Sequence, residues 1–123
     1  MSNEVSPFFE VEKVIDTYFK ALYECDHETL NNLFDPKARV SGFYEHEHIH
    51  QSINEYVFFI RKISSPAMLG EDFNMRILSM NVEGSIACCK VAYLFESLQY
   101  KEFLSLLRVD GKWTIISKTF QHD

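Results

Sequence analysis

The chain has 123 residues, a hydrophobic fraction of 46% and eleven Phe, which suits one compact domain with an ample apolar core and leaves no room for a second. Its net charge of −6 would repel phosphate backbones and anionic lipid surfaces, and its Lys and Arg residues are scattered, so we expect neither nucleic acid nor a membrane as partner. The expected organisation is a single domain over residues 1–123.

The sequence predicts a cytoplasmic protein with free thiols. It lacks a charged start followed by an apolar run and a small-residue cleavage site, and no stretch approaches the length that crosses a bilayer. Cys25, Cys88 and Cys89 are an odd number, and two adjacent residues point to opposite faces of a strand. We therefore expect buried free thiols and no disulfide framework.

Two helices are predicted at the start of the chain. Ser6-Pro7 combines an N-cap with the residue favoured at the first helical position, and apolar residues then recur at helical spacing to about Cys25. Asp26 can cap a second, short helix, which must end by Asp35 because Pro36 cannot continue it.

The next stretch predicts a strand, a connection and a third helix. Residues 38–43 alternate partly, as in a strand, and residues 44–51 are polar enough for a loop or an extension of that strand. Ser52 then offers an N-cap to a helix over residues 53–63, where apolar residues repeat every three or four positions.

From residue 74 onward the pattern changes to extended segments. Residues 74–82 and 86–96 flank a turn at Glu83-Gly84, and residues 100–120 form two apolar runs around Asp110-Gly111, a dipeptide suited to a tight hairpin turn. Helices followed by strands predict an α+β domain.

Two long motifs carry a resemblance to a known family. They are VIDTYFKALYECDHETLNNLFDPKARVSGF at residues 14–43 and FLSLLRVDGKWTIISKTF at residues 103–120. Together they make residues 8–121 resemble the putative lumazine-binding family, within the superfamily of nuclear transport factor 2, ketosteroid isomerase and polyketide cyclases. The resemblance implies a cone-shaped nuclear transport factor 2-like fold, in which three N-terminal helices pack into the concave side of a curved antiparallel sheet, with a pocket at the open end.

Tyr18 is the first candidate for chemistry. It stands in the sequence YFKAL, which is similar to the YxxAL of ketosteroid isomerases, where the tyrosine donates to a substrate oxyanion. That chemistry also needs a carboxylate base and a second, protonated acid. The same resemblance puts Gly42 in the position of the base and Ser105 in that of the acid, so it does not imply steroid-type isomerisation. A core tyrosine bonded to a neighbouring polar group is the other interpretation of Tyr18.

The sequence HEHIH places His46, His48 and His50 on one face if the segment is extended. Three imidazoles with Glu45 or Glu47 nearby could ligate zinc. No HExxH helix or CxxC pair accompanies them, however, so we predict no metal and no cofactor. The alternative is an exposed polar loop at the rim of the pocket, where the imidazoles would titrate near neutral pH.

The leading functional hypothesis is a small-molecule binding domain with an apolar, aromatic-lined conical pocket and an unidentified ligand. An aromatic excess and a cavity-enclosing fold favour it. Lys118 and Thr119 lie near the end of the last strand, and Ser105 and Ser117 interrupt otherwise apolar runs. A small hydroxyl on an inner face could orient a ligand, but a bond to nearby backbone is the preferred interpretation. The candidate ligand-binding residues are Tyr18, Phe19, Phe58, Tyr93, Phe95, Phe103, Ser105 and Trp113.

Two other classes of function stay open. One is an isomerase, dehydratase or cyclase, in which Tyr18 would donate to a developing oxyanion and His46, His48 or His50 would act as base. This enzyme requires a histidine within hydrogen-bond reach of the cavity. The other is a structural or partner-binding module, for which side chains would fill the cavity completely.

The apolar pattern of two predicted strands indicates a homodimer formed through the outer face of the sheet. The segment from Ile86 to Glu96 is apolar on nearly both faces, interrupted chiefly by Lys90, and residues 98–109 repeat the pattern. Because helices of one chain can cover only one face, the other would expose a large apolar patch. A two-fold pairing of sheets would bury it, as in many members of the superfamily that the chain resembles.

Overall fold

The computed structural model describes residues 6–123, so part of the N-terminal stretch on which the expectation of no leader rests lies outside the described residues. Within this range the three expected helices form, and each begins directly after the predicted cap. They are α1 (Pro7–Glu24), α2 (His27–Leu33) and α3 (Ile53–Lys62). None of these helices is long and apolar enough to cross a membrane.

Local side-chain chemistry explains the helix boundaries. The Ser6 hydroxyl accepts a hydrogen bond from the backbone N–H of Phe9, and the C-cap that follows α1 is Cys25, whose φ of 50° is left-handed. At the start of α3, Ser52 and Glu55 form a capping box, in which each side chain accepts from the backbone N–H of the other. These bonds satisfy amides that have no partner inside a helix.

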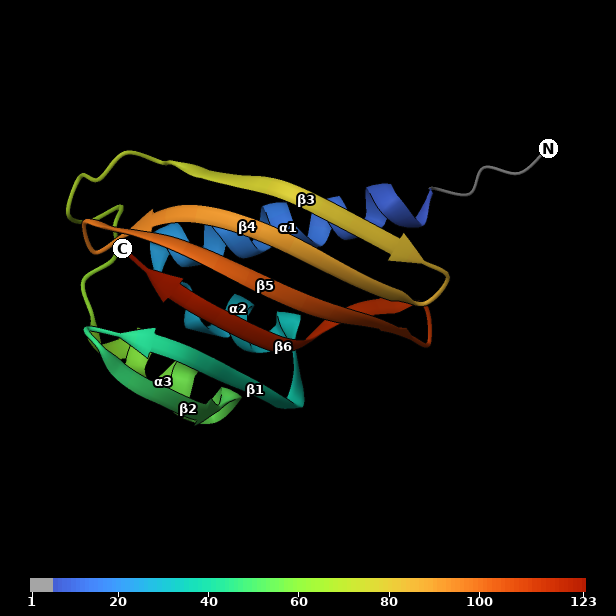
Figure 1. Cartoon of the computed structure of the whole chain (residues 1–123), viewed down its shortest axis with the longest axis horizontal. Helices are drawn as coiled ribbons and strands as arrows, with labels where there is room; N and C mark the ends of the chain where they lie inside the picture. The colour runs from blue at the N-terminus through green and yellow to red at the C-terminus, as the bar shows by residue number, and fades with distance from the viewer. Residues whose placement is uncertain (1–5) are drawn as a thin grey trace.

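Six strands form one sheet in the order β2-β1-β6-β5-β4-β3 (Figure 1). Their bounds are β1 (Phe34–Tyr44), β2 (Glu47–Ser52), β3 (Met75–Glu83), β4 (Ile86–Phe95), β5 (Leu98–Val109) and β6 (Lys112–His122). β1 begins earlier than the predicted residues 38–43, and the stretch predicted as loop or strand extension is a turn followed by β2. The α+β class is confirmed.

One pairing corrects the expectation of an antiparallel sheet. β1 and β6 run parallel, with Val40 opposite Lys118 and Gly42 opposite Phe120, whereas the other four pairings are antiparallel. A parallel pair requires a long crossover. Here the crossover is the whole chain from β2 to β5, which motifs confined to neighbouring residues do not reveal.

The three helices cover one face of the curved sheet, and the core lies between the two layers (Figure 1). Along β5 the buried residues are Tyr100, Glu102, Leu104 and Leu106, which alternate with exposed or half-buried ones. The inner face therefore carries a charged residue, Glu102, within an apolar row. The candidate functional site lies against this row of residues.

A β-bulge in β6 changes which residues face inward. Leu106 pairs with Ile115 and Ser105 with Ser117, so Ile116 is an extra residue on β6. Before the bulge Trp113 and Ile115 are buried, and after it Lys118 is buried instead of Ser117. The bulge thus turns the Lys118 side chain into the core.

Candidate functional site

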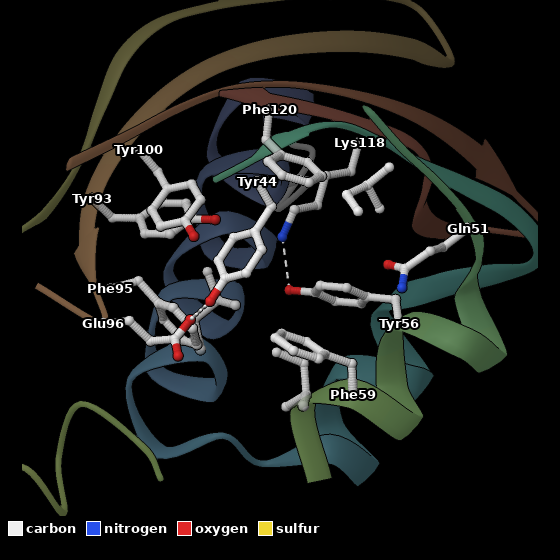
Figure 2. Close-up of a pocket in the computed structure, with 13 residues that line it drawn as sticks. Tyr44, Gln51, Tyr56, Phe59, Tyr93, Phe95, Glu96, Tyr100, Lys118 and Phe120 are labelled. Carbon is white, nitrogen blue, oxygen red and sulfur yellow. Dashed lines mark hydrogen bonds between the residues drawn. The ribbon is translucent and has the colours of Figure 1, made fainter. Parts of the chain in front are cut away.

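A cavity of about 130 Å³ opens between α3 and the inner face of the sheet. More than half of its wall is aromatic, and the aromatic rings come from helix and sheet alike (Figure 2). Its buried end is formed by residues of α1, α3 and the central strands, and its mouth by less buried residues of β1, β2 and the turn after β4. The lining residues are Leu22, Tyr44, Ile49, Gln51, Tyr56, Phe59, Ile60, Tyr93, Phe95, Glu96, Tyr100, Lys118 and Phe120.

Lys118 and Tyr56 are the polar groups at the buried end of the cavity. The Lys118 ammonium donates to the Tyr56 hydroxyl at 2.7 Å and forms an ion pair with Glu102 Oε2 at 3.0 Å. Lys118 is 3% exposed and Glu102 is 1% exposed. Charges buried this deeply persist only where they are paired and hydrogen-bonded.

Two tyrosines complete the coordination of Glu102. The Tyr18 hydroxyl donates to Oε1 at 2.6 Å, and the Tyr93 hydroxyl donates to Oε2. Together with Lys118, three donors therefore converge on one carboxylate, the pattern expected of an ionised acid. We call Glu102, Lys118, Tyr18, Tyr56 and Tyr93 the buried polar cluster.

The cluster fixes the protonation of its members. Burial alone would lower the pKa of Lys118, but the Glu102 carboxylate and the Tyr56 hydroxyl outweigh it, and the pKa of Lys118 is raised above its usual value. Burial, reinforced by the charge of Glu102, raises the pKa of Tyr18 and Tyr93 well above the usual tyrosine value. At neutral pH the cluster therefore holds an ammonium and neutral phenols.

The mouth of the cavity carries a second set of polar groups. The Tyr44 hydroxyl donates to Glu96 Oε1 at 3.2 Å, and Gln51 lines the wall opposite them (Figure 2). His122 contacts the rings of Tyr44 and Tyr100 from outside the lining. The cavity thus combines an acidic rim with a donor-rich buried end.

The structure brings only part of the predicted ligand-binding set to this cavity. Tyr93 and Phe95 line it. Tyr18 and Phe19 are buried behind it, and the Tyr18 hydroxyl donates a hydrogen bond to Glu102. Trp113 is also buried but does not line the cavity, and its indole N–H faces Glu10 at 3.4 Å.

Three other predicted residues lie away from the cavity. Phe58 is 55% exposed on α3, where its ring contacts the Lys62 ammonium. Phe103 is 55% exposed, and Ser105 shares its strand face, opposite to the buried row of β5. Because strand side chains alternate between faces, neither Phe103 nor Ser105 can reach the cavity side.

The three histidines do not converge on the cavity. His46 lies in the turn before β2, and His48 and His50 are exposed on the strand face opposite to Ile49. His50 Nδ1 instead bonds the Ser41 hydroxyl at 2.7 Å. The juxtaposition of Tyr18 with a rim histidine that the enzyme hypothesis needs is therefore not formed. Within residues 6–123, no group of three or more His, Cys, Asp or Glu side chains could hold a metal ion.

Sequence reasoning missed Glu102 and Tyr56 as site residues, and it placed Lys118 near the end of the last strand without giving it a role in the site. Strict alternation from Tyr100 to Leu104 would have placed Glu102 on the inner face. The helical spacing of α3 likewise put Tyr56 on its apolar side, where a buried phenol needs a partner. Lys118 gave no such signal, because the bulge reverses the alternation of β6.

The comparisons with known proteins agree with this architecture. An NTF-2 like protein of unknown function from Silicibacter pomeroyi DSS-3 is 24% identical, with a TM-score of 0.79 and coverage of 94% of this chain and 95% of that one. An NTF2-like protein of unknown function from Shewanella baltica OS155 is 19% identical, with a TM-score of 0.82 and coverage of 100% and 98%.

A cystatin-like fold protein from Burkholderia xenovorans LB400 is 16% identical, with a TM-score of 0.69 and coverage of 93% and 89%. At these identities the likeness shows the fold, and the expected nuclear transport factor 2-like architecture is confirmed. A search of curated proteins finds no match. The sequence pattern of one family, described as "Putative lumazine-binding", matches residues 6–121. The chain therefore belongs to the putative lumazine-binding family and has a nuclear transport factor 2-like fold.

Proposed function

We propose that this protein binds a small, flat, largely apolar molecule in the cavity between α3 and the sheet. The observation that carries the proposal is the aromatic lining around a small number of polar groups at defined places, which is typical of ligand sites. The open volume also argues against a purely structural module, whose side chains would fill the space. The family description supports a flat heteroaromatic ligand such as lumazine.

The size of the cavity limits what can enter it. An engineered apolar cavity of about 150 Å³ accommodates benzene, so a cavity of about 130 Å³ takes one six-membered ring. A second fused ring would lie at the mouth, between Tyr44, Gln51 and Glu96. Tricyclic flavins and steroids would extend into solvent and gain little from the aromatic wall.

Titration with lumazine, a flavin and a steroid, followed by ¹H–¹⁵N NMR, tests the proposal. Saturable shifts of amides in α3 and β6 are expected with lumazine. Trp113 fluorescence is a poor reporter because Trp113 does not line the cavity. Ile49→Trp should block the mouth and weaken binding at least about tenfold, whereas His48→Trp, on the opposite strand face, should not. No saturable shift with any of the three ligands would overturn the proposal.

We also propose that the protein forms a homodimer through the outer face of the sheet. Large apolar side chains are exposed there on several neighbouring strands, and burying them in a two-fold interface would remove them from water. They are Phe43, Leu78, Ile86, Phe103 and Val109. A cytoplasmic location, and the absence of nucleic acid and membrane partners, remain predictions from sequence and charge.

A further inference from the structure

We propose that the buried end of the cavity recognises a neutral carbonyl oxygen of the ligand, through the Tyr56 hydroxyl and the Lys118 ammonium. The inference rests on the proposed ligand-binding function and names the chemical class of the ligand: a planar ring that carries a ketone, amide or lactam. Three features of the buried polar cluster lead to it.

The first feature is the proton of Tyr56. An ammonium has donors and no acceptor, so the 2.7 Å hydrogen bond between Lys118 and Tyr56 must use the phenol oxygen as acceptor. The phenol proton then needs another acceptor, and among residues 6–123 the Tyr56 hydroxyl donates to no other group. Figure 2 shows the Tyr56 hydroxyl and the Lys118 nitrogen directed into the middle of the cavity. A ligand oxygen there would accept from the phenol.

The second feature is the third N–H of Lys118. Its ammonium directs one N–H to Glu102 and one to Tyr56. Among the described residues the third N–H has no oxygen or nitrogen acceptor, and the ammonium is otherwise surrounded by the aromatic rings of Tyr18, Tyr93 and Phe120. Because Lys118 lines the cavity, this donor and the Tyr56 hydroxyl belong to the same buried end. One carbonyl oxygen has two lone pairs and can accept from both.

The third feature is the balance of charge. Glu102 at 3.0 Å neutralises Lys118, so the buried end attracts oxygen dipoles without carrying a net positive charge. Glu96 adds a negative charge at the mouth, which disfavours an anionic ligand, while the ammonium disfavours a cation. The neutral carbonyl is the acceptor that these charges favour.

The same pairing excludes a covalent alternative. An imine with a ligand carbonyl requires lysine as a free amine with a lone pair. Lys118 is instead held as an ammonium between Glu102 and Tyr56. The carbonyl is therefore bound reversibly, by hydrogen bonds alone.

Matched ligands test the inference. Acetophenone and α-methylstyrene have the same shape, but the second has a methylene in place of the carbonyl oxygen, and benzoate is the anionic counterpart. Their affinities are measured by NMR titration for wild type, Tyr56→Phe and Tyr23→Phe. Tyr23→Phe is the control because it removes a tyrosine hydroxyl that lies outside the cavity lining and donates to the Glu71 carbonyl.

The measured quantity is the ratio of the Kd of α-methylstyrene to the Kd of acetophenone. We expect this ratio to be about tenfold larger in wild type than in Tyr56→Phe, because the variant lacks one hydrogen bond to the carbonyl. Tyr23→Phe should leave the ratio unchanged, and benzoate should bind more weakly than acetophenone. Equal ratios in wild type and Tyr56→Phe, or tighter binding of benzoate, would overturn the inference while leaving the proposed function intact. If neither neutral ligand binds, the one-ring version of the proposed function fails.

A second measurement needs no variant. Hydrogen-bond donors move the ¹³C resonance of a carbonyl downfield, so carbonyl-labelled acetophenone bound to wild type should shift downfield relative to its position in an aprotic solvent. An unshifted carbonyl resonance in the bound state would overturn the inference even if Tyr56→Phe fails to fold.

Discussion

In the core, Glu102 accepts hydrogen bonds from Tyr18 and Tyr93 and forms an ion pair with Lys118. A buried ion pair gains little over a well-packed apolar pair, because desolvation of both charges offsets their attraction. Removing one partner is far more costly, since the remaining charge is left buried and unpaired. The stability of this domain therefore depends on the cluster being complete.

Glu102→Gln should lower the free energy of unfolding by about 3–5 kcal/mol, because Lys118 loses its counter-ion while staying buried. Urea unfolding followed by circular dichroism measures the change. Ser105→Ala, on the outer face of the same strand, is the control and should change stability by less than about 0.5 kcal/mol. A loss in Glu102→Gln as small as in the control would show that Lys118 is not an ammonium in the core.

The cluster also predicts alkaline sensitivity. In the unfolded chain Tyr18 and Tyr93 titrate near pH 10.0 and Lys118 near pH 10.5. In the fold, burial and the charge of Glu102 raise the pKa of the two tyrosines, and Glu102 and Tyr56 raise the pKa of Lys118 against the opposing effect of burial, so all three stay protonated to higher pH. Above about pH 10 the folded state thus binds more protons than the unfolded state, and the free energy of unfolding falls as pH rises.

Urea unfolding between about pH 8 and pH 11 measures this fall. At the lower end Tyr18, Tyr93 and Lys118 are protonated in both the folded and the unfolded state, so their full contribution to the free energy of unfolding should be present there. Tyr18→Phe removes one titrating group, so its slope above pH 10 should be shallower by up to about 1.4 kcal/mol per pH unit. An unchanged slope in that variant would contradict the assignment of the pKa shift to Tyr18.

At the scale of elements, β1 and β6 pack closely against each other at Gly42. Gly42 faces Phe120 across the parallel pair, and a Cβ on Gly42 would overlap the Phe120 carbonyl oxygen and lie 2.7 Å from its ring. Phe120 lines the cavity. The missing side chain of Gly42 therefore makes room for one wall of the site.

Gly42→Ala should lower the free energy of unfolding by about 1–3 kcal/mol, the usual cost of overpacking, because backbone on β6 has to move. It should also weaken ligand binding by displacing Phe120. Thr119→Ala, an exposed neighbour on β6, is the control for both measurements. Wild-type stability in Gly42→Ala would mean that the seam has room to adjust.

Elements were largely predictable because their signals are local. The helix caps at Ser6, Asp26 and Ser52 and the turn at Asp110-Gly111 depend on neighbours in sequence. The structure has a cap or a turn at each of these four predicted positions. The parallel β1–β6 pair and the bulge at Ile116 depend on distant strands. The bulge decides where Lys118 points, so the sequence indicated a cavity but not the polar groups at its buried end.

At the scale of the whole molecule, the outer sheet face determines the expected assembly. Sedimentation equilibrium at micromolar concentration should give about twice the chain mass of 14.5 kDa. Phe103→Arg should yield monomers, since it places a charge in the apolar face. Phe58→Arg is matched to it, because Phe58 is also 55% exposed but lies on α3, and it should stay dimeric. Wild-type monomers under these conditions would contradict the proposed interface.

The position of β6 has a consequence for how the chain is made. β6 is the last strand in sequence, yet it joins the β1–β2 hairpin to β5, β4 and β3. While residues 112–122 are still inside the ribosome, the strand between β1 and β5 is missing and Glu102 lacks its counter-ion. Any sheet formed before that point has open edges at β1 and β5, and unpaired edges favour association with other chains. We therefore expect the fold to be completed only when β6 is available, and a chain halted after Val109 to be more susceptible to proteolysis than the complete chain.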